Sequence, residues 1–129
     1  MMGILCGVDI VEVQRIKQSF ETLGDSFRDR IFTRAEIEYC EGKKAVKYQS
    51  YAARFAAKEA VSKAFGTGIG EKVGWKDIEV LNDDSGKPYV VLSAKGRKVF
   101  DEINASNISL SLSHCKNYAV AYAVVEVNK

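Results

Sequence analysis

Two carboxylates stand where the sequence around them predicts buried, apolar surface. Glu59 belongs to a run of strong helix formers and follows Ala52 and Phe55 on the stripe that should face the core. Lys63 lies one helical turn further on. A hard divalent cation takes carboxylate and phosphate oxygens together, so this pattern predicts a place for a metal ion and phosphates. The alternative is an ordinary core helix with a Glu59–Lys63 pair on its surface.

The second carboxylate, Asp9, lies in segment 4–11, where alternation and β-branched residues predict a strand. Aspartate is depleted in strands, and its ionised form needs a partner there, such as a metal or a basic group. The alternative is that the strand ends at Val8 and Asp9 caps a helix that starts near Val11.

Two further features of the sequence could take part in binding or catalysis. Three glycines in segment 66–70 follow the predicted helix, and they allow positive φ and a close approach of a ligand to the backbone. His114 continues an apolar strand face and is the one side chain whose ordinary pKa lies near neutrality. A satisfied, buried imidazole is the alternative for this histidine.

The elements that must position these residues form one α+β domain over residues 1–129. A central helix over 47–65 would be roughly 28 Å long. Thr33 and Glu36 form the pattern of a capping box for another helix. Shorter helices are predicted over 11–23, 27–32, 33–40 and 94–103, a β-hairpin over 75–92, and strands over 108–114 and 118–127. We therefore expect one antiparallel β-sheet packed against a long central helix and shorter helices.

Composition and charge exclude several classes of protein. The net charge of +2 is too small to indicate nucleic-acid binding, but residues 28–63 hold nine Lys/Arg against five Asp/Glu. This excess indicates a face for an acidic partner or a polyphosphate, with a solvated face of mixed charge as the alternative. The three cysteines are far apart and predict neither disulfides nor a zinc site, which fits a reducing cytoplasm. We expect no membrane span and no signal peptide.

Four motifs together resemble the holo-acyl-carrier-protein synthase family, the short-chain 4′-phosphopantetheinyl transferases. They are GVDIVE at 7–12, RFAAKEAVSKAFGTG at 54–68, GKP at 86–88 and SLSH at 111–114, so the resemblance covers the whole chain. It implies the fold of those transferases. It implies transfer of the 4′-phosphopantetheine group from coenzyme A to a serine of an apo-acyl carrier protein, with release of adenosine 3′,5′-bisphosphate. Magnesium as cofactor, and a homotrimer with active sites shared between subunits, are implied as well.

The resemblance also assigns roles to single residues. Asp9 and Glu59 match the two magnesium ligands, and Lys63 matches a lysine that stabilises charge on the transferring phosphate. The base that deprotonates the serine remains open among Asp9, Glu59 and a metal-bound water. The residues expected at coenzyme A are Arg54, Lys58, Lys63, Gly66, Thr67, Gly68, Lys87, Pro88 and His114, with Lys87 and Pro88 reaching it from the neighbouring subunit.

The surface for the carrier protein departs from the family pattern, in which several arginines hold an acidic helix of the carrier. The contacts expected here are Arg15, Lys17, Phe27, Arg28 and Arg30. Segment 21–26 is not basic. Docking should therefore be weaker, or depend more on apolar contact through Phe20, Phe27 and Ile31.

Two other functions fit the residue pattern. One is a metal-dependent phosphohydrolase that cleaves a nucleotide pyrophosphate with water as the acceptor. The other is a non-catalytic nucleotide-binding module, which would need no pair of metal carboxylates.

Overall fold

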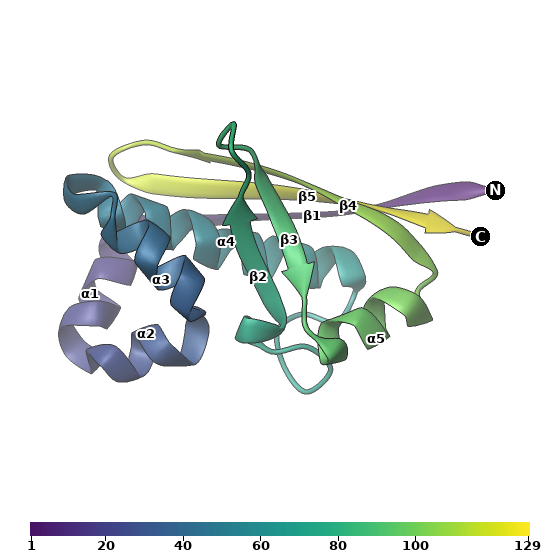
Figure 1. The fold of residues 1–129 in the computed structure, drawn as a ribbon, viewed down its shortest axis with the longest axis horizontal. Coiled ribbons are helices and arrows are strands. Elements are labelled where there is room, and N and C mark those ends of the chain that lie inside the picture. The colour runs from purple at the N-terminus through teal and green to yellow at the C-terminus, as the bar shows by residue number, and fades with distance from the viewer.

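Helix α4 (Lys47–Phe65) runs along one face of a three-stranded antiparallel sheet (Figure 1). The sheet has the order β1-β5-β4 and comprises β1 (Met2–Glu12), β5 (Tyr118–Asn128) and β4 (Ala105–His114). The structure is a computed structural model that describes residues 1–129. It contains no helix with both the length and the apolar character needed to cross a membrane.

Small side chains allow α4 to lie close to the sheet. Ala56 and Ala60 on the helix are fully buried in the same cluster as Ala121 and Ala123 on β5. The helix ends at Gly66, whose φ of +84° is left-handed and favours glycine. Its predicted boundaries, residues 47 and 65, are confirmed.

The opposite face of the sheet carries no helix (Figure 1). On this face Ile4, Val8 and Ile10 are 54–65 % exposed, and Tyr118 and Tyr122 on β5 are also exposed. An apolar sheet face that is open to solvent is a recognised mark of an interaction surface.

The remaining elements cover the ends and one side of α4. Helices α1 (Val13–Leu23), α2 (Asp25–Ile31) and α3 (Arg34–Glu41) enclose a second core cluster around Phe32 and Tyr51. Strands β2 (Ile78–Asn82) and β3 (Pro88–Leu92) form a separate two-stranded hairpin, followed by α5 (Ala94–Glu102). Short 3₁₀ turns occupy Lys44–Val46 and Trp75–Asp77.

The predicted α+β class is confirmed, with three corrections to local structure. The hairpin is a sheet of its own, so the expectation of one sheet was wrong. Strand β1 continues to Glu12, so Asp9 lies within the strand and does not cap α1. Strand β4 begins at Ala105, directly after Asn104 with φ +58°, where a loop was expected. The capping box of Thr33 and Glu36 is present as predicted.

Candidate active site

Gly7 brings strand β1 into direct contact with α4. A Cβ atom at this position would lie 1.8 Å from the carbonyl oxygen of Ala60, so only glycine permits this approach. Gly7 and Asp9 point to the same face of the strand, and Ala60 directly follows Glu59. The close crossing therefore brings the two carboxylates together.

Asp9 and Glu59 line one cavity of about 370 Å³. Its other walls come from β1, α1, α2 and Phe55 of α4. Burial raises the pKa of Glu59, the negative charge of Asp9 raises it further, and Lys63 opposes both effects. Two carboxylates thus lie close together, and Lys63 offsets only part of their negative charge, which favours binding of a cation.

Lys63 lies beside Asp9 and not beside Glu59. Its Nζ donates to Asp9 Oδ1 at 3.0 Å and to the carbonyl oxygen of Val8 at 3.1 Å. The simple Glu59–Lys63 surface pair is therefore absent. Lys63 therefore partly offsets the charge of one of the two carboxylates, Asp9.

The donor set fits magnesium that is shared with a phosphate ligand. No group of three or more His, Cys, Asp or Glu side chains in the chain could hold a metal on its own. Magnesium is commonly held by one or two carboxylates and completes its octahedron with water and substrate phosphate oxygens. Asp9 and Glu59 supply such a pair.

Arg54 forms a second polar site, in a cavity of about 290 Å³. Its side chain is only 2 % exposed, and its guanidinium lies 4.0 Å from the centre of the Tyr39 ring. It donates to Asn82 Oδ1 and, at 3.5 Å, to Ser50 Oγ. Its Nε is the one buried side-chain nitrogen or oxygen without a partner. A buried guanidinium that lines a cavity is suited to bind an anion there.

The rim of this Arg54 pocket is also basic. Lys43 and His114 line it, together with Gly86 and Pro88 of the hairpin. His114 is exposed, so the alternative of a buried imidazole is wrong. Sequence reasoning found Arg54, Pro88 and His114 but missed Tyr39, Lys43 and Asn82. Of these three, only Lys43 had a signal, the two consecutive lysines at 43–44.

Lys87 lies outside the Arg54 pocket. It lines a neighbouring cavity of about 620 Å³, beside Tyr89 of β3 and Ser109 of β4. Its backbone amide donates to Asp83 Oδ1 at 2.9 Å, which shapes the hairpin turn.

The structure gives Lys58 a different role from the one expected, and it uses the backbone amides of the glycine-rich exit within the chain. Lys58 is fully buried, and its ammonium group contacts three acceptors in the core, so no donor is left for coenzyme A. The amides of Thr67 and Gly68 donate to the carbonyl oxygen of Ser62, and the amide of Gly66 to that of Lys63. These three donors cap the C-terminus of α4 and are not free to hold phosphates.

The residues expected at the carrier protein are only partly accessible. Arg15 is exposed and lines the Asp9–Glu59 cavity, and Lys17 and Arg30 are exposed as well. Ile31 is 1 % exposed and belongs to the core, so it cannot provide the apolar contact we expected. Phe27 is 7 % exposed but lines the Asp9–Glu59 cavity, and Phe20 is half-buried.

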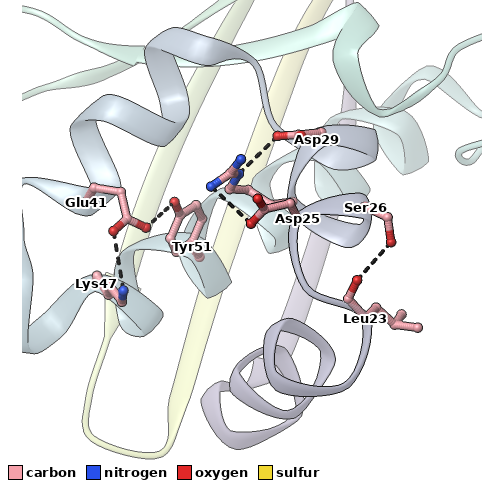
Figure 2. Close-up of polar contacts among 8 residues, drawn as sticks. Leu23, Asp25, Ser26, Asp29, Glu41, Lys47 and Tyr51 are labelled. Carbon is pink, nitrogen blue, oxygen red and sulfur yellow. Dashed lines mark hydrogen bonds and ion pairs between the residues drawn. The ribbon is translucent and has the colours of Figure 1, made fainter.

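Arg28 is partly neutralised by its own neighbours. It pairs with Asp25 at 3.4 Å and with Asp29 at 3.0 Å. Figure 2 labels both aspartates, near the separate contacts of Glu41 with Tyr51 and Lys47. Arg15 is therefore the best placed of the predicted docking residues, since it lies at the mouth of the site.

This fold, with two carboxylates meeting between its central helix and first strand, belongs to a known class. The chain matches the 4′-phosphopantetheinyl transferase superfamily over residues 5–123 and is a member of it. Among its relatives, the holo-[acyl-carrier-protein] synthase of Ruminiclostridium cellulolyticum is 59 % identical over 126 residues, which cover 98 % of this chain and 94 % of the relative.

Solved structures agree with this assignment. The holo-[acyl-carrier-protein] synthase of Helicobacter pylori, in complex with coenzyme A, superposes with a TM-score of 0.83 at 33 % identity and covers 94 % of this chain and 99 % of that one. The enzyme of Bacillus anthracis, in complex with CoA (3′,5′-ADP), has a TM-score of 0.80 at 41 % identity, and the match covers 99 % of this chain and 100 % of that one.

Proposed function

We propose that this chain transfers the 4′-phosphopantetheine group of coenzyme A to a serine hydroxyl of an apo-acyl carrier protein, with magnesium held by Asp9 and Glu59. The observation that carries the proposal is the meeting of these two carboxylates at one cavity, with Lys63 paired to Asp9. The relatives named holo-[acyl-carrier-protein] synthase support the reaction and the acceptor.

In this reaction the serine oxygen forms a bond to the phosphorus that carries pantetheine. The bond from that phosphorus to the bridging oxygen breaks, and adenosine 3′,5′-bisphosphate leaves with the oxygen. Bound magnesium would offset the negative charge that develops on the phosphates. Lys63, about half exposed, can turn from Asp9 to donate to the same phosphate oxygens. The serine proton passes to Asp9, Glu59 or water.

The two polar cavities of one chain lie on different sides of α4. Arg54 and Glu59 are five residues apart and so point about 140° apart around the helix. The cavities that they line have no residue in common. A single coenzyme A molecule carries a pyrophosphate and a separate 3′-phosphate. We infer that the pyrophosphate binds at Asp9 and Glu59 of one subunit and the 3′-phosphate in the Arg54 pocket of the next.

The open face of the sheet supports an oligomer in which such sites can form. Ile4, Val8 and Ile10 would be covered there, and the burial of exposed apolar surface favours association. We propose the homotrimer of the family, with Lys87 and Pro88 contributed by the same subunit as Arg54. The three free cysteines suit a reducing compartment, and we propose a cytoplasmic location.

Subunit mixing tests the shared site. Glu59→Ala chains should be inactive alone, and Arg54→Ala chains should be strongly impaired at a coenzyme A concentration well below their raised KM. After denaturation and refolding together in equal amounts, about one site in four should combine an intact Glu59 with an intact neighbouring Arg54. Recovery of about a quarter of the wild-type rate is expected. No recovery, from mixtures shown to contain both chains in one oligomer, would place the whole site within a single chain.

Product analysis separates transfer from hydrolysis. A transferase releases adenosine 3′,5′-bisphosphate only when an apo-acyl carrier protein is present, whereas a phosphohydrolase releases it with water alone. Binding of coenzyme A without any release would indicate the non-catalytic module. Chromatography of the nucleotides, with and without carrier protein, distinguishes the three functions.

A further inference from the structure

A buried ion pair, Glu36 with Lys58, lies outside both cavities. Both side chains are completely inaccessible to solvent, and Lys58 Nζ lies 2.9 Å from Glu36 Oε1. The pair is not part of the chemistry described above, since neither group faces a cavity.

The ammonium of Lys58 ties α4 to the start of the hairpin. Besides contacting Glu36, its Nζ donates to the carbonyl oxygens of Trp75, at 2.9 Å, and Ile78, at 2.7 Å. Trp75 begins the 3₁₀ turn that leads into β2, and Ile78 is the first residue of that strand.

The carboxylate of Glu36 ties α3 to the same strand. Its Oε1 accepts from the Thr33 amide at 2.8 Å, and its Oε2 accepts from the Val80 amide at 2.7 Å. Each polar group in the pair is therefore used, and three elements meet at one point: α3, α4 and β2.

Stability alone is a weak reason for such a pair. Desolvation of two charges often offsets their attraction, and well-packed apolar residues of similar volume commonly serve as well or better. An apolar contact, however, is not directional, whereas five hydrogen bonds fix the separation and angle of the elements they join.

The elements held by these hydrogen bonds, α4 and the β2–β3 hairpin, also form walls of the Arg54 pocket. Arg54 lies four residues before Lys58, on the same side of α4. Asn82, which accepts from Arg54, ends strand β2 only two residues after Val80. Gly86 and Pro88, further along the hairpin, form the opposite wall of the pocket.

We propose that Glu36 and Lys58 are positioning residues that hold the β2–β3 hairpin against α4 and thereby set the shape of the Arg54 pocket. This inference rests on the proposed function, in which that pocket receives the 3′-phosphate of coenzyme A. Loosening the pair should weaken recognition of the 3′-phosphate and leave the chemistry at Asp9 and Glu59 intact.

The test compares coenzyme A with dephospho-coenzyme A, which lacks the 3′-phosphate. The double variant Glu36→Gln, Lys58→Met removes both charges together, so that no buried charge is left unpaired. A core variant of α4, Val61→Ala, is the control for lost stability, because Val61 is fully buried and lines neither cavity. For each protein we would measure kcat and KM with both substrates, and the melting temperature.

The wild type should prefer coenzyme A in kcat/KM. The double variant should lose about tenfold or more of this preference, the effect of one charge-assisted hydrogen bond, through a higher KM for coenzyme A at nearly unchanged kcat. Val61→Ala should melt earlier but keep the preference. If the double variant does not fold, Lys58→Arg keeps the charge while its larger head group displaces the hairpin, and the same loss is expected.

The outcomes separate the two claims. A double variant that keeps the full preference for coenzyme A shows that the pair only stabilises the fold, and the inference is wrong. A wild type that transfers pantetheine without any preference for the 3′-phosphate refutes the assignment of the Arg54 pocket. A wild type without transfer refutes the proposed function itself.

Discussion

Replacement of Gly7 by alanine should separate the two halves of the active site. The added Cβ would lie 1.8 Å from the Ala60 carbonyl oxygen and 2.8 Å from the Ala64 amide nitrogen, and both of these are backbone atoms that cannot rotate away. Such contacts stay above 3.0 Å in real structures, so β1 must move from α4 by more than about 1 Å. Asp9 travels with β1, whereas Glu59 stays with α4.

The size of the effect follows from this displacement. A misplacement of about 1 Å in a catalytic constellation can cost about 10²-fold in rate. Overpacking of a core contact costs about 1–3 kcal/mol of unfolding free energy, which corresponds to roughly 4–12 °C in Tm for a domain of this size. We therefore expect a folded protein that melts earlier, with kcat/KM for transfer about 10²-fold below wild type.

Gly3→Ala is the matched control on the same strand. Its Cβ would meet the flexible Lys129 side chain, which can move aside, and Val127 at 3.2 Å. This variant should keep transfer activity and Tm close to those of wild type. Transfer by Gly7→Ala within threefold of wild type would refute the account of how Asp9 and Glu59 are brought together.

Three further predictions concern other parts of the molecule. Lys63→Met should slow transfer by about 10²-fold. The same variant should bind Mn²⁺ up to about fivefold more tightly in the free enzyme, because an ion pair worth about 0.2–1 kcal/mol no longer competes for Asp9. Weaker Mn²⁺ binding by the variant, measured by electron paramagnetic resonance, would contradict this. Burial raises the pKa of Cys40 to about 11, above its value in the unfolded chain, so the thiol favours the folded state below pH 9 and this contribution is lost as pH rises through 11. The unfolding free energy of wild type should fall by about 2 kcal/mol more than that of Cys40→Ala between pH 9 and pH 11, and parallel curves would contradict this. Arg15→Ala should raise KM for the carrier protein and reduce its dependence on salt, whereas Arg28→Ala should have little effect because Asp25 and Asp29 already pair with it; equal effects of the two variants would show that the local pairs do not matter.

Local structure was largely predictable from the sequence, because local signals specify it. The boundaries of α4 follow from its helix formers and from Gly66, and the start of α3 from the capping box of Thr33 and Glu36. The alternation over residues 4–11 correctly predicted a strand there. The separate β2–β3 sheet was not predictable, since strand pairing is a tertiary choice.

The candidate site was only partly predictable. Glu59 was anomalous by its spacing on the helix, and Asp9 because aspartate is rare in strands. Their meeting, however, depends on the close approach of β1 to α4 at Gly7, which no local sequence pattern indicates. Lys58 illustrates the limit of motif reasoning. It stands beside Glu59 in the sequence, yet the helical rotation of about 100° per residue turns it into the core toward Glu36.

The most direct test of the central claim is the intact mass of a purified apo-acyl carrier protein after incubation with this protein, coenzyme A and magnesium. Parallel reactions would contain a chelator, Asp9→Asn or Glu59→Gln. The account predicts a gain equal to one phosphopantetheine group with the wild type, and no gain in the three parallel reactions. A carrier protein that gains this mass equally well with both variants would contradict the assignment of Asp9 and Glu59, and one that never gains it would contradict the proposed transfer.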